Sequence, residues 1–315
     1  MSMYSGAVPG AGLAVLEAGA AVVWRAYGLA DLEERVESTP ATNYRLASMT
    51  KQFTAAAILL LAEDGRLSID DPVRKWLPGL PESAAAVLIR HLLTHTAGLA
   101  DFEELIPAGT SMQLHDCDVL TLLEAPRRGY FPPGTKFRYS NSGYVLLALI
   151  VARASGSDFA TFLRRRIFLP LDMQQSVAFE AGKSTVTQRA FGYSSCGSSW
   201  RRTDQNLTSA TLGDGGIYSS IQDLAKWDAA LYDGRLLHPE SLRQAFAPAV
   251  GSDDPAVRYG FGWRVNGHAL WHSGESIGFR NVIVRYPRRR TTVIILTNRD
   301  HPEPYPTALA IAEAF

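Results

Sequence analysis

The spacing of apolar and polar residues differs between the middle of the chain and its two ends. Residues 12–17 and 21–27 are rich in β-forming residues and are separated by a short loop, which predicts a hairpin. From residue 67 to about 246, apolar residues mostly recur at the three-to-four-residue spacing of helices. Strand patterns then return, and Asn266-Gly267 between the first two of them is a strong hairpin signal. These predicted strands are 259–265, 268–273, 279–286 and 291–297.

This order of strands, helices and strands predicts an α+β fold. We expect both ends of the chain to form one antiparallel sheet that is flanked by helices, with a large helical lobe inserted between them. The predicted sheet domain is discontinuous and comprises residues 1–66 and 255–315, and residues 67–254 form the predicted helical domain.

The stretch from Leu46 to Gly65 is the clearest helix candidate, because its apolar residues recur at helical spacing and Gly65 supplies a stop. Ser48 and Lys51 lie three residues apart in its first turn, so their side chains project from one face. A lysine kept neutral can take the proton of a serine, and free N–H groups at a helix start favour developing negative charge. Alone, this Ser-x-x-Lys pattern is weak, since a capping serine and a solvated lysine would look the same.

Composition narrows the class of protein. The chain has 315 residues with 46% hydrophobic residues, which is enough for a sizeable core, and a formal net charge of +0, which argues against nucleic acid or an anionic membrane as the main partner. Cys117 and Cys196 fit neither a disulfide framework nor a metal-binding spacing, and no metal is expected. No run reaches the ~18 apolar residues of a membrane span. The N-terminus does not resemble a signal peptide, so we expect a cytoplasmic protein, or a periplasmic or extracellular one if a leader was trimmed.

Two further stretches carry candidate chemistry. Tyr139 and Asn141 follow a proline- and glycine-rich turn. Tyrosine beside a cation can exchange a proton, and asparagine can hold a lysine and a substrate amide together. At the end of a predicted strand, His272 and Ser273 can present donors to a substrate, and a backbone N–H just after Gly274 can help to form an oxyanion hole. The plain alternatives are a buried tyrosine, a turn asparagine and a glycine turn.

Together, these three motifs resemble the serine β-lactamase and penicillin-binding protein superfamily, in the branch of class C β-lactamases, D-alanyl peptidases and related esterases. The motifs fall in the family's order, as Ser48-x-x-Lys51, Tyr139-x-Asn141 and His272-Ser273-Gly274. The surrounding segments 91–99, 133–134, 215–219 and 223–225 match as well, so the likeness covers the chain from Pro9 to about Asn298.

The resemblance implies acyl transfer without a cofactor. Ser48 would attack a carbonyl while Lys51 and Tyr139 share the role of general base, and Asn141 would orient Lys51 and the substrate. The backbone N–H groups of Ser48 and Glu275 would hold the oxyanion. The implied partners are small esters, β-lactams or D-amino-acid peptides. We expect a carboxylesterase first and a β-lactamase or D-aminoacyl peptidase second, and a catalytically silent protein that binds peptidoglycan-like ligands is the alternative of another class.

The chain departs from the family pattern, and it contains a rival nucleophile. His272 stands where β-lactamases of this branch carry lysine, and a histidine with a pKa near ~6.5 would be only partly charged. Glu275 adds a carboxylate beside the expected oxyanion site, and the family's leading helix is missing or very short. Residues 274–278 also fit Gly-x-Ser-x-Gly, which would make Ser276 the nucleophile of an α/β-hydrolase elbow. That elbow requires a helix directly after the serine, whereas a strand pattern follows here.

Overall fold

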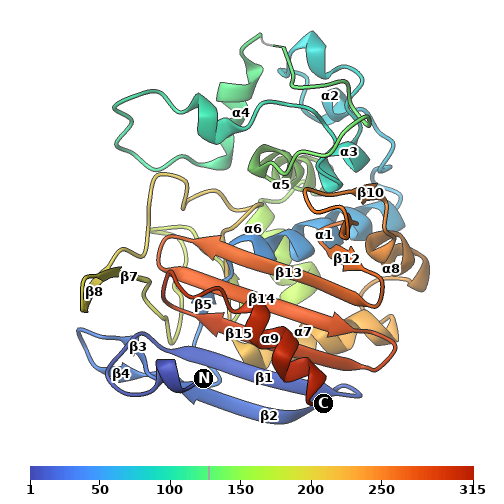
Figure 1. The fold of residues 1–315 in the computed structure, drawn as a ribbon. Coiled ribbons are helices and arrows are strands. Elements are labelled where there is room, and N and C mark those ends of the chain that lie inside the picture. The colour runs from blue at the N-terminus through green and yellow to red at the C-terminus, as the bar shows by residue number, and fades with distance from the viewer. Residues whose placement is uncertain (127) are drawn as a thin grey trace.

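The computed structural model describes residues 1–126 and 128–315, and both ends of the chain build one antiparallel sheet there (Figure 1). Within these residues the sheet has eight strands in the order β10-β11-β12-β13-β14-β15-β1-β2, so the predicted α+β class is confirmed. The N-terminal strands are β1 (Ala11–Glu17) and β2 (Ala20–Tyr27). The C-terminal strands are β10 (Val250–Gly251), β11 (Arg258–Tyr259), β12 (Arg264–Asn266), β13 (Ala269–Ser276), β14 (Phe279–Tyr286) and β15 (Thr291–Thr297).

Most of the chain between these strands forms the helical lobe that lies above the sheet in Figure 1. Its helices and those that contact the sheet are α1 (Lys51–Glu63), α2 (Val73–Trp76), α3 (Ile89–Leu93), α4 (Asp116–Glu124), α5 (Asn141–Ser155), α6 (Phe159–Leu163), α7 (Ile221–Asp233), α8 (Pro239–Phe246) and α9 (Tyr305–Glu313). Short 3₁₀ turns are η1 (Ser2–Tyr4), η2 (Ala47–Thr50), η3 (Glu82–Ala84) and η4 (Phe102–Leu105), and the π-helical turn η5 (Arg164–Phe168) follows α6.

Helices cover both faces of the sheet. α9 packs against β14 and β15 on one face, where Val282, Val293 and Ala308 belong to a small apolar cluster. On the other face, α7 contacts β1 and β15, and the main core extends from there through α1 into the helical lobe. Residues Lys51 to Leu61 of α1 are all buried, because α1 lies between the sheet and the lobe. The long apolar run predicted in this helix is therefore explained by its central place.

A buried ion pair joins α7 to the sheet. The Arg285 Nε on β14 donates to Asp228 Oδ1 on α7 at 2.5 Å, and both side chains are almost fully buried. The Thr292 hydroxyl donates to the same carboxylate oxygen at 2.9 Å, and the Arg285 guanidinium lies 4.5 Å from the ring of Tyr232. A buried pair of this kind holds its geometry because each charge depends on the other and on its remaining hydrogen bonds.

Several short strands were not predicted, some before residue 46 and others inside the region that sequence periodicity assigned mainly to helices. β5 (Tyr44–Arg45), β9 (Ile217–Ser219) and β6 (Val177–Ala178) form a small sheet, and β7 (Tyr193–Cys196) pairs with β8 (Ser199–Arg202). A two-stranded sheet is formed by β3 (Leu29–Asp31) and β4 (Val36–Glu37). Strands of two to four residues are too short to show an alternating pattern, so these elements were missed.

The division into two domains remains a prediction, and two elements of the structure bear on its boundary. β10 belongs to the main sheet although it precedes residue 255, where the predicted sheet domain resumes. α7 was assigned to the helical domain, yet it packs against β1 and β15 of the sheet.

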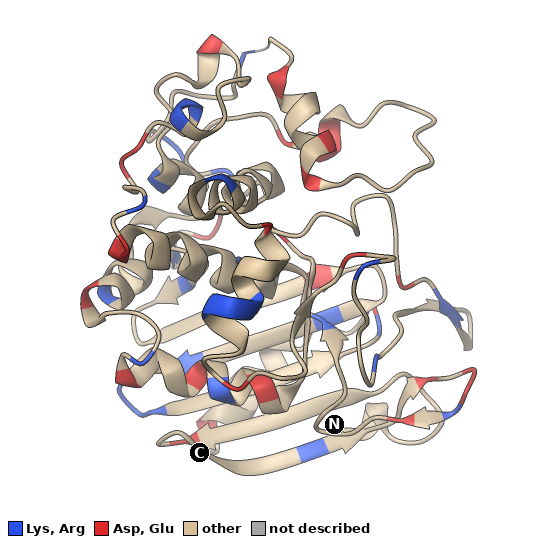
Figure 2. Cartoon of the chain, turned by 180° about the vertical axis from the view of Figure 1, so that it is seen from behind, with Lys and Arg blue, Asp and Glu red and all other residues tan. Residues whose placement is uncertain are grey.

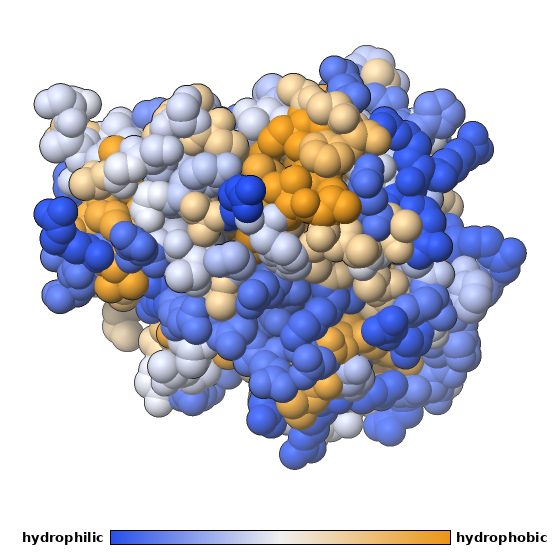
Figure 3. Space-filling model, turned by 90° about the horizontal axis from the view of Figure 1, so that it is seen from below, coloured by the Kyte–Doolittle hydropathy of each residue, from blue (hydrophilic) through white to orange (hydrophobic). Residues whose placement is uncertain are grey.

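Charged residues of both signs are interspersed along the chain throughout the fold (Figure 2), in line with its balanced composition. Seen from below, apolar residues form one large cluster and smaller separate ones on a largely hydrophilic surface (Figure 3). Within the described residues, no single helix is long and apolar enough to cross a membrane. α5 and the α6–η5 segment pass that test only as a pair that is bent by 75°.

Candidate active site

Ser48 lies in η2, the tight turn that leads from β5 into α1. The Leu46 N–H donates to the Ile217 carbonyl at 2.8 Å, which fixes the start of this turn against β9. Ala47 has a φ of 49°, a left-handed conformation that L-residues rarely adopt. The first N–H groups of a helical turn lack acceptors within the helix, so the strained entry to Ser48 presents backbone donors at the serine.

Lys51 is fully buried, and its ammonium is surrounded by three acceptors. Its Nζ lies 2.9 Å from Ser48 Oγ, 2.8 Å from Asn141 Oδ1 and 3.0 Å from the carbonyl oxygen of Asp214. Three acceptors match the three N–H donors of an ammonium group. Burial raises the pKa of the Asp214 carboxyl, and the Lys51 charge opposes that shift. The structure thus brings the first motif and the asparagine of the second motif into direct contact.

Asn141 is the first residue of α5, and an acidic loop holds it in place. Its backbone N–H donates to Asp101 Oδ2 at 3.0 Å, and its Nδ2 donates to Glu103 Oε1 at 2.9 Å. Because Nδ2 is engaged by Glu103, Oδ1 is the atom that faces Lys51. Partial burial raises the pKa of the Glu103 carboxyl, while the hydrogen bond from Asn141 opposes the shift.

Tyr139 lies beside Lys51, two residues before Asn141. The Lys51 Nζ is 5.0 Å from the centre of the Tyr139 ring, and the ring itself is partly buried. Among the described residues, the Tyr139 hydroxyl makes no hydrogen bond, either to Ser48 or to Lys51. Catalytic hydrogen bonds are often long in enzymes without substrate, so the shared general-base role of Tyr139 stays a prediction.

His272 on β13 is buried and uncharged. Its Nδ1 lies 2.6 Å from the Ser273 carbonyl, which only an N–H can satisfy, so Nε2 accepts from the Tyr259 hydroxyl at 2.9 Å. Burial, followed by the charge of Lys51, lowers the pKa of His272 to about 3. The expectation of a partly charged histidine in the third motif was therefore wrong, because its surroundings exclude water and already contain a cation.

The remaining residues of the third motif lie on a free edge of β13, since β12 pairs with β13 only at residues 269–271. A Cβ on Gly274 would lie 2.0 Å from the Leu46 carbonyl oxygen, so only glycine lets this strand approach the Ser48 turn so closely. The neighbouring Ser273 is partly buried. The Glu275 side chain is 57% exposed and lies 3.9 Å from the Arg280 guanidinium. Its backbone remains the predicted second oxyanion donor.

The geometry around Ser276 differs from an α/β-hydrolase elbow. Ser276 is the last residue of β13 and pairs with Phe279 at the start of β14. A strand, rather than a helix, therefore follows the serine across the turn at Ile277 and Gly278. Among the described residues, the buried Ser276 hydroxyl has no hydrogen-bond partner. Ser276 lacks the local structure that the rival mechanism requires.

Three residues near this site were not assigned any role from the sequence. Glu103 was not singled out, because its contact with Asn141 joins η4 to α5, which are far apart in the sequence. Arg264 on β12 lies 5.9 Å from the Tyr139 ring centre and forms an ion pair with Asp253. His95 belongs to a segment that supported the family resemblance, and its ring centre lies 4.3 Å from that of Tyr139.

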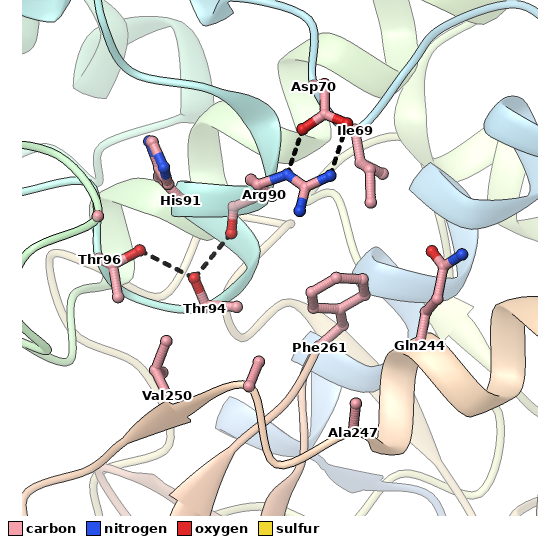
Figure 4. A pocket seen from close by; sticks show the side chains of 12 residues that line it. Ile69, Asp70, Arg90, His91, Thr94, Thr96, Gln244, Ala247, Val250 and Phe261 are labelled. Atoms are coloured by element: carbon pink, nitrogen blue, oxygen red, sulfur yellow. Dashed lines mark hydrogen bonds and ion pairs between the residues drawn. The ribbon is translucent and has the colours of Figure 1, made fainter.

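A pocket lies away from these residues, between α3 and the end of α8 (Figure 4). It has a volume of about 590 Å³, and its lining residues include Ile69, Thr94 and Phe261 but none of the three predicted catalytic residues. Arg90 at its edge is bonded to Asp70 at 2.6 Å. Within the described part of the chain, no group of three or more histidine, cysteine, aspartate or glutamate side chains is placed to hold a metal ion.

Comparison with known proteins identifies the family to which this chain belongs. The model of the family described as Beta-lactamase matches residues 2–315. The chain belongs to the beta-lactamase family. This beta-lactamase family member is a serine hydrolase, as the motif order implied.

Two curated relatives and one solved structure show what this family member is similar to. Penicillin-binding protein 4* of Bacillus subtilis (strain 168) is 33% identical over 312 residues, which cover 93% of this chain and 69% of the relative. The D-aminopeptidase of Gluconobacter oxydans (strain 621H) is 28% identical over 92% of this chain, which spans only 56% of that protein. The structure of D-amino acid amidase from Ochrobactrum anthropi SV3, in complex with L-phenylalanine amide, superposes with a TM-score of 0.80. It is 27% identical, over 93% of this chain and 87% of the amidase.

Proposed function

We propose that this protein hydrolyses carboxylic esters through an acyl-enzyme formed on Ser48. The observation that carries the proposal is the contact of the buried Lys51 Nζ with both Ser48 Oγ and Asn141 Oδ1. A serine hydroxyl becomes a useful nucleophile when a neighbouring base can accept its proton. In its neutral form, which has a lone pair, the buried Lys51 amine held by Asn141 and the Asp214 carbonyl is such a neighbour.

The reaction then proceeds in two balanced steps. Ser48 Oγ attacks the ester carbonyl, its proton passes to the Lys51–Tyr139 pair, and the backbone N–H groups of Ser48 and Glu275 stabilise the oxyanion. Collapse breaks the bond to the alcohol, which leaves with the proton returned by Tyr139. Water then attacks the acyl-enzyme, releases the carboxylic acid and restores Ser48.

The charges around the site favour acyl groups without a carboxylate. His272 is neutral where β-lactamases of this branch carry a lysine, and the nearby Arg264 is already paired with Asp253. The carboxylates of Glu103 and Glu275 add negative charge near Asn141 and the free edge of β13. A β-lactam carries a carboxylate that these groups would repel, so penicillin turnover is expected to be weak.

Glu103 also favours a second candidate, the hydrolysis of D-amino acid amides. Its carboxylate, bonded to Asn141 Nδ2 and partly exposed, is placed to pair with the α-ammonium group of an aminoacyl substrate. The names of two relatives, a D-aminopeptidase and a D-amino acid amidase, support the same chemistry. A catalytically silent homologue would have the same folded site but would form no acyl-enzyme.

The test compares the parent with Ser48→Ala and Ser276→Ala, a matched substitution of a second serine. We expect p-nitrophenyl acetate turnover to fall at least ~10³-fold in Ser48→Ala and to persist in Ser276→Ala. Labelling by fluorescent penicillin should be slow in the parent and absent in Ser48→Ala. Turnover that survives Ser48→Ala but disappears in Ser276→Ala would overturn the proposal, and a parent that is never acylated would point to the silent homologue.

Glu103→Gln separates the two candidate substrate classes. If Glu103 binds an ammonium group, the ratio of D-alanine p-nitroanilide to p-nitrophenyl acetate turnover, taken as kcat/KM, should fall about tenfold. An unchanged ratio would remove the argument for the amide substrate and leave the ester proposal standing.

A further inference from the structure

His95 contacts the Tyr139 segment in three ways. Its carbonyl oxygen accepts from the Arg138 N–H at 2.9 Å, and its ring Nδ1 accepts from the Ser140 N–H at 3.2 Å. Its imidazole ring faces the Tyr139 ring at a centroid distance of 4.3 Å and an interplanar angle of 31°. One residue thus holds the backbone on both sides of Tyr139 and also supports its ring.

The chain on either side of His95 strengthens this contact. The Gly134 N–H donates to the Thr96 carbonyl at 2.8 Å, and the Tyr130 N–H donates to the Gly98 carbonyl at 2.7 Å. The segment from residue 95 to 98 therefore lies along the loop that carries Tyr139. The other hydrogen bonds between these two segments join backbone atoms. Next to Tyr139, the His95 side chain also accepts a hydrogen bond, from the Ser140 N–H.

His95 shows two features that folding alone does not favour. Its φ of 57° is left-handed, and its buried Nε2 has no hydrogen-bond partner among the described residues. Such strained or unsatisfied groups persist where the surrounding structure holds them for a function. The ring lies among the rings of Tyr144, Tyr259 and Phe137, so its position is fixed from several sides.

We infer that His95 is a positioning residue that sets the distance of the Tyr139 hydroxyl from Ser48 and Lys51. The inference rests on the proposed function, in which Tyr139 carries a proton between Ser48 and the leaving group. A proton carrier needs a defined position, because a displacement of about 1 Å can cost two orders of magnitude in rate. Within the described part of the chain, the Tyr139 hydroxyl has no hydrogen-bond partner, so the contacts with His95 supply the restraint.

The protonation state of His95 suits this role. Since Nδ1 accepts a hydrogen bond, the proton of the neutral ring is on Nε2. Burial, followed by the positive charge of Lys51, keeps the pKa of His95 well below its usual range. The acceptor that holds Ser140 is therefore retained throughout the pH range in which the enzyme is assayed.

A double-mutant cycle with Tyr139→Phe tests the inference. His95→Phe keeps a ring but removes the acceptor, and His95→Asn keeps an acceptor close to the backbone, tolerates the left-handed conformation and removes the ring. His91→Asn is the matched control, because the Nδ1 of His91 also accepts a backbone N–H at 3.2 Å, from Leu88, and the bond does not involve the Tyr139 loop. Each variant is measured for kcat and KM with p-nitrophenyl acetate, for its pH–rate profile and for thermal stability.

We expect His95→Phe to lower kcat about 10- to 100-fold with little change in KM, and His95→Asn to lower it less. In the Tyr139→Phe background, either His95 substitution should lower kcat by a further factor of less than about three. Its effect acts through the Tyr139 hydroxyl, which this background already lacks. The pH–rate profile should change in His95→Phe and stay as in the parent for His91→Asn.

Additive effects of His95 and Tyr139 substitutions, or parent-like kinetics in folded His95→Phe, would overturn the inference and leave the proposed function intact. If Tyr139→Phe alone keeps the parent activity, the proposed function loses its proton carrier, and the positioning role is refuted with it. If His95→Phe does not fold, the double-mutant cycle is carried out with His95→Asn, and its melting temperature shows whether that variant is folded during the assay.

Discussion

Gly274→Ala probes the contact between β13 and the Ser48 turn. The added Cβ would lie 2.0 Å from the Leu46 carbonyl oxygen and 3.3 Å from the Met49 nitrogen, and real Cβ atoms essentially never approach closer than 3.0 Å. The strand or the turn must therefore move by about 1 Å. Because this movement separates the two predicted oxyanion donors, Ser48 N–H and Glu275 N–H, kcat should fall about 10²- to 10³-fold.

The assay combines steady-state hydrolysis of p-nitrophenyl acetate with thermal unfolding. Overpacking costs about 1–3 kcal/mol of stability, so Gly274→Ala should melt only a few degrees below the parent and be fully folded during the assay. Gly251→Ala is the matched control, since a Cβ at Gly251 of β10 in the same sheet meets nothing within 4 Å. A Gly274→Ala enzyme that keeps kcat within threefold of the parent would refute the reasoning.

Two further predictions concern stability. Arg285→Met leaves the Asp228 carboxylate buried without its partner and should cost about 3–5 kcal/mol, whereas Arg166→Met, which breaks a more exposed pair with Asp64, should cost less than about 1 kcal/mol by urea denaturation. Equal losses would contradict this account. The pKa of His272 is about 3 in the folded protein and about 6.5 in the unfolded chain, so between these values only the unfolded chain binds the proton, and stability falls as the pH falls. His272→Asn should make this fall shallower between pH 6 and 4 by about 1.4 kcal/mol per pH unit, and an unchanged slope in urea titrations would exclude His272 as its cause.

Long strands and helices could be predicted from the sequence because their signals are local. The strands at 279–286 and 291–297 were predicted with the bounds that the structure shows, since each is an uninterrupted run of β-forming residues and a turn containing Pro287 separates them. β9 could not be found in this way, because its three residues become a strand only by pairing with β5 and β6, which are far away in the sequence.

The third motif shows where local signals mislead. Gly274 suggested that the strand ended near Ser273, but β13 continues to Ser276 and turns at Ile277 and Gly278. Glycine is required at 274 for the close approach of another segment, which sequence pattern alone cannot distinguish from a turn.

The candidate site was predicted by motif order, and its surroundings were not. Ser48, Lys51 and Asn141 converge as the resemblance implied, and Tyr139 lies beside Lys51, with its ring centre 5.0 Å from the Lys51 Nζ. The charge state of His272 depends on burial and on Lys51, and the contacts of Glu103 and His95 depend on loops that meet only in the folded chain. No spacing in the sequence contains this information.

The sheet topology has a consequence for protein synthesis. Ser48 is translated long before β13 (Ala269–Ser276), which closes the other wall of its site. β1 likewise cannot complete its pairing in the main sheet until β15, which is far away in the sequence, has been made. A nascent chain that has not reached β13 therefore carries its nucleophile without a second oxyanion donor, and the edge of β1 that faces β15 stays unpaired until β15 is made.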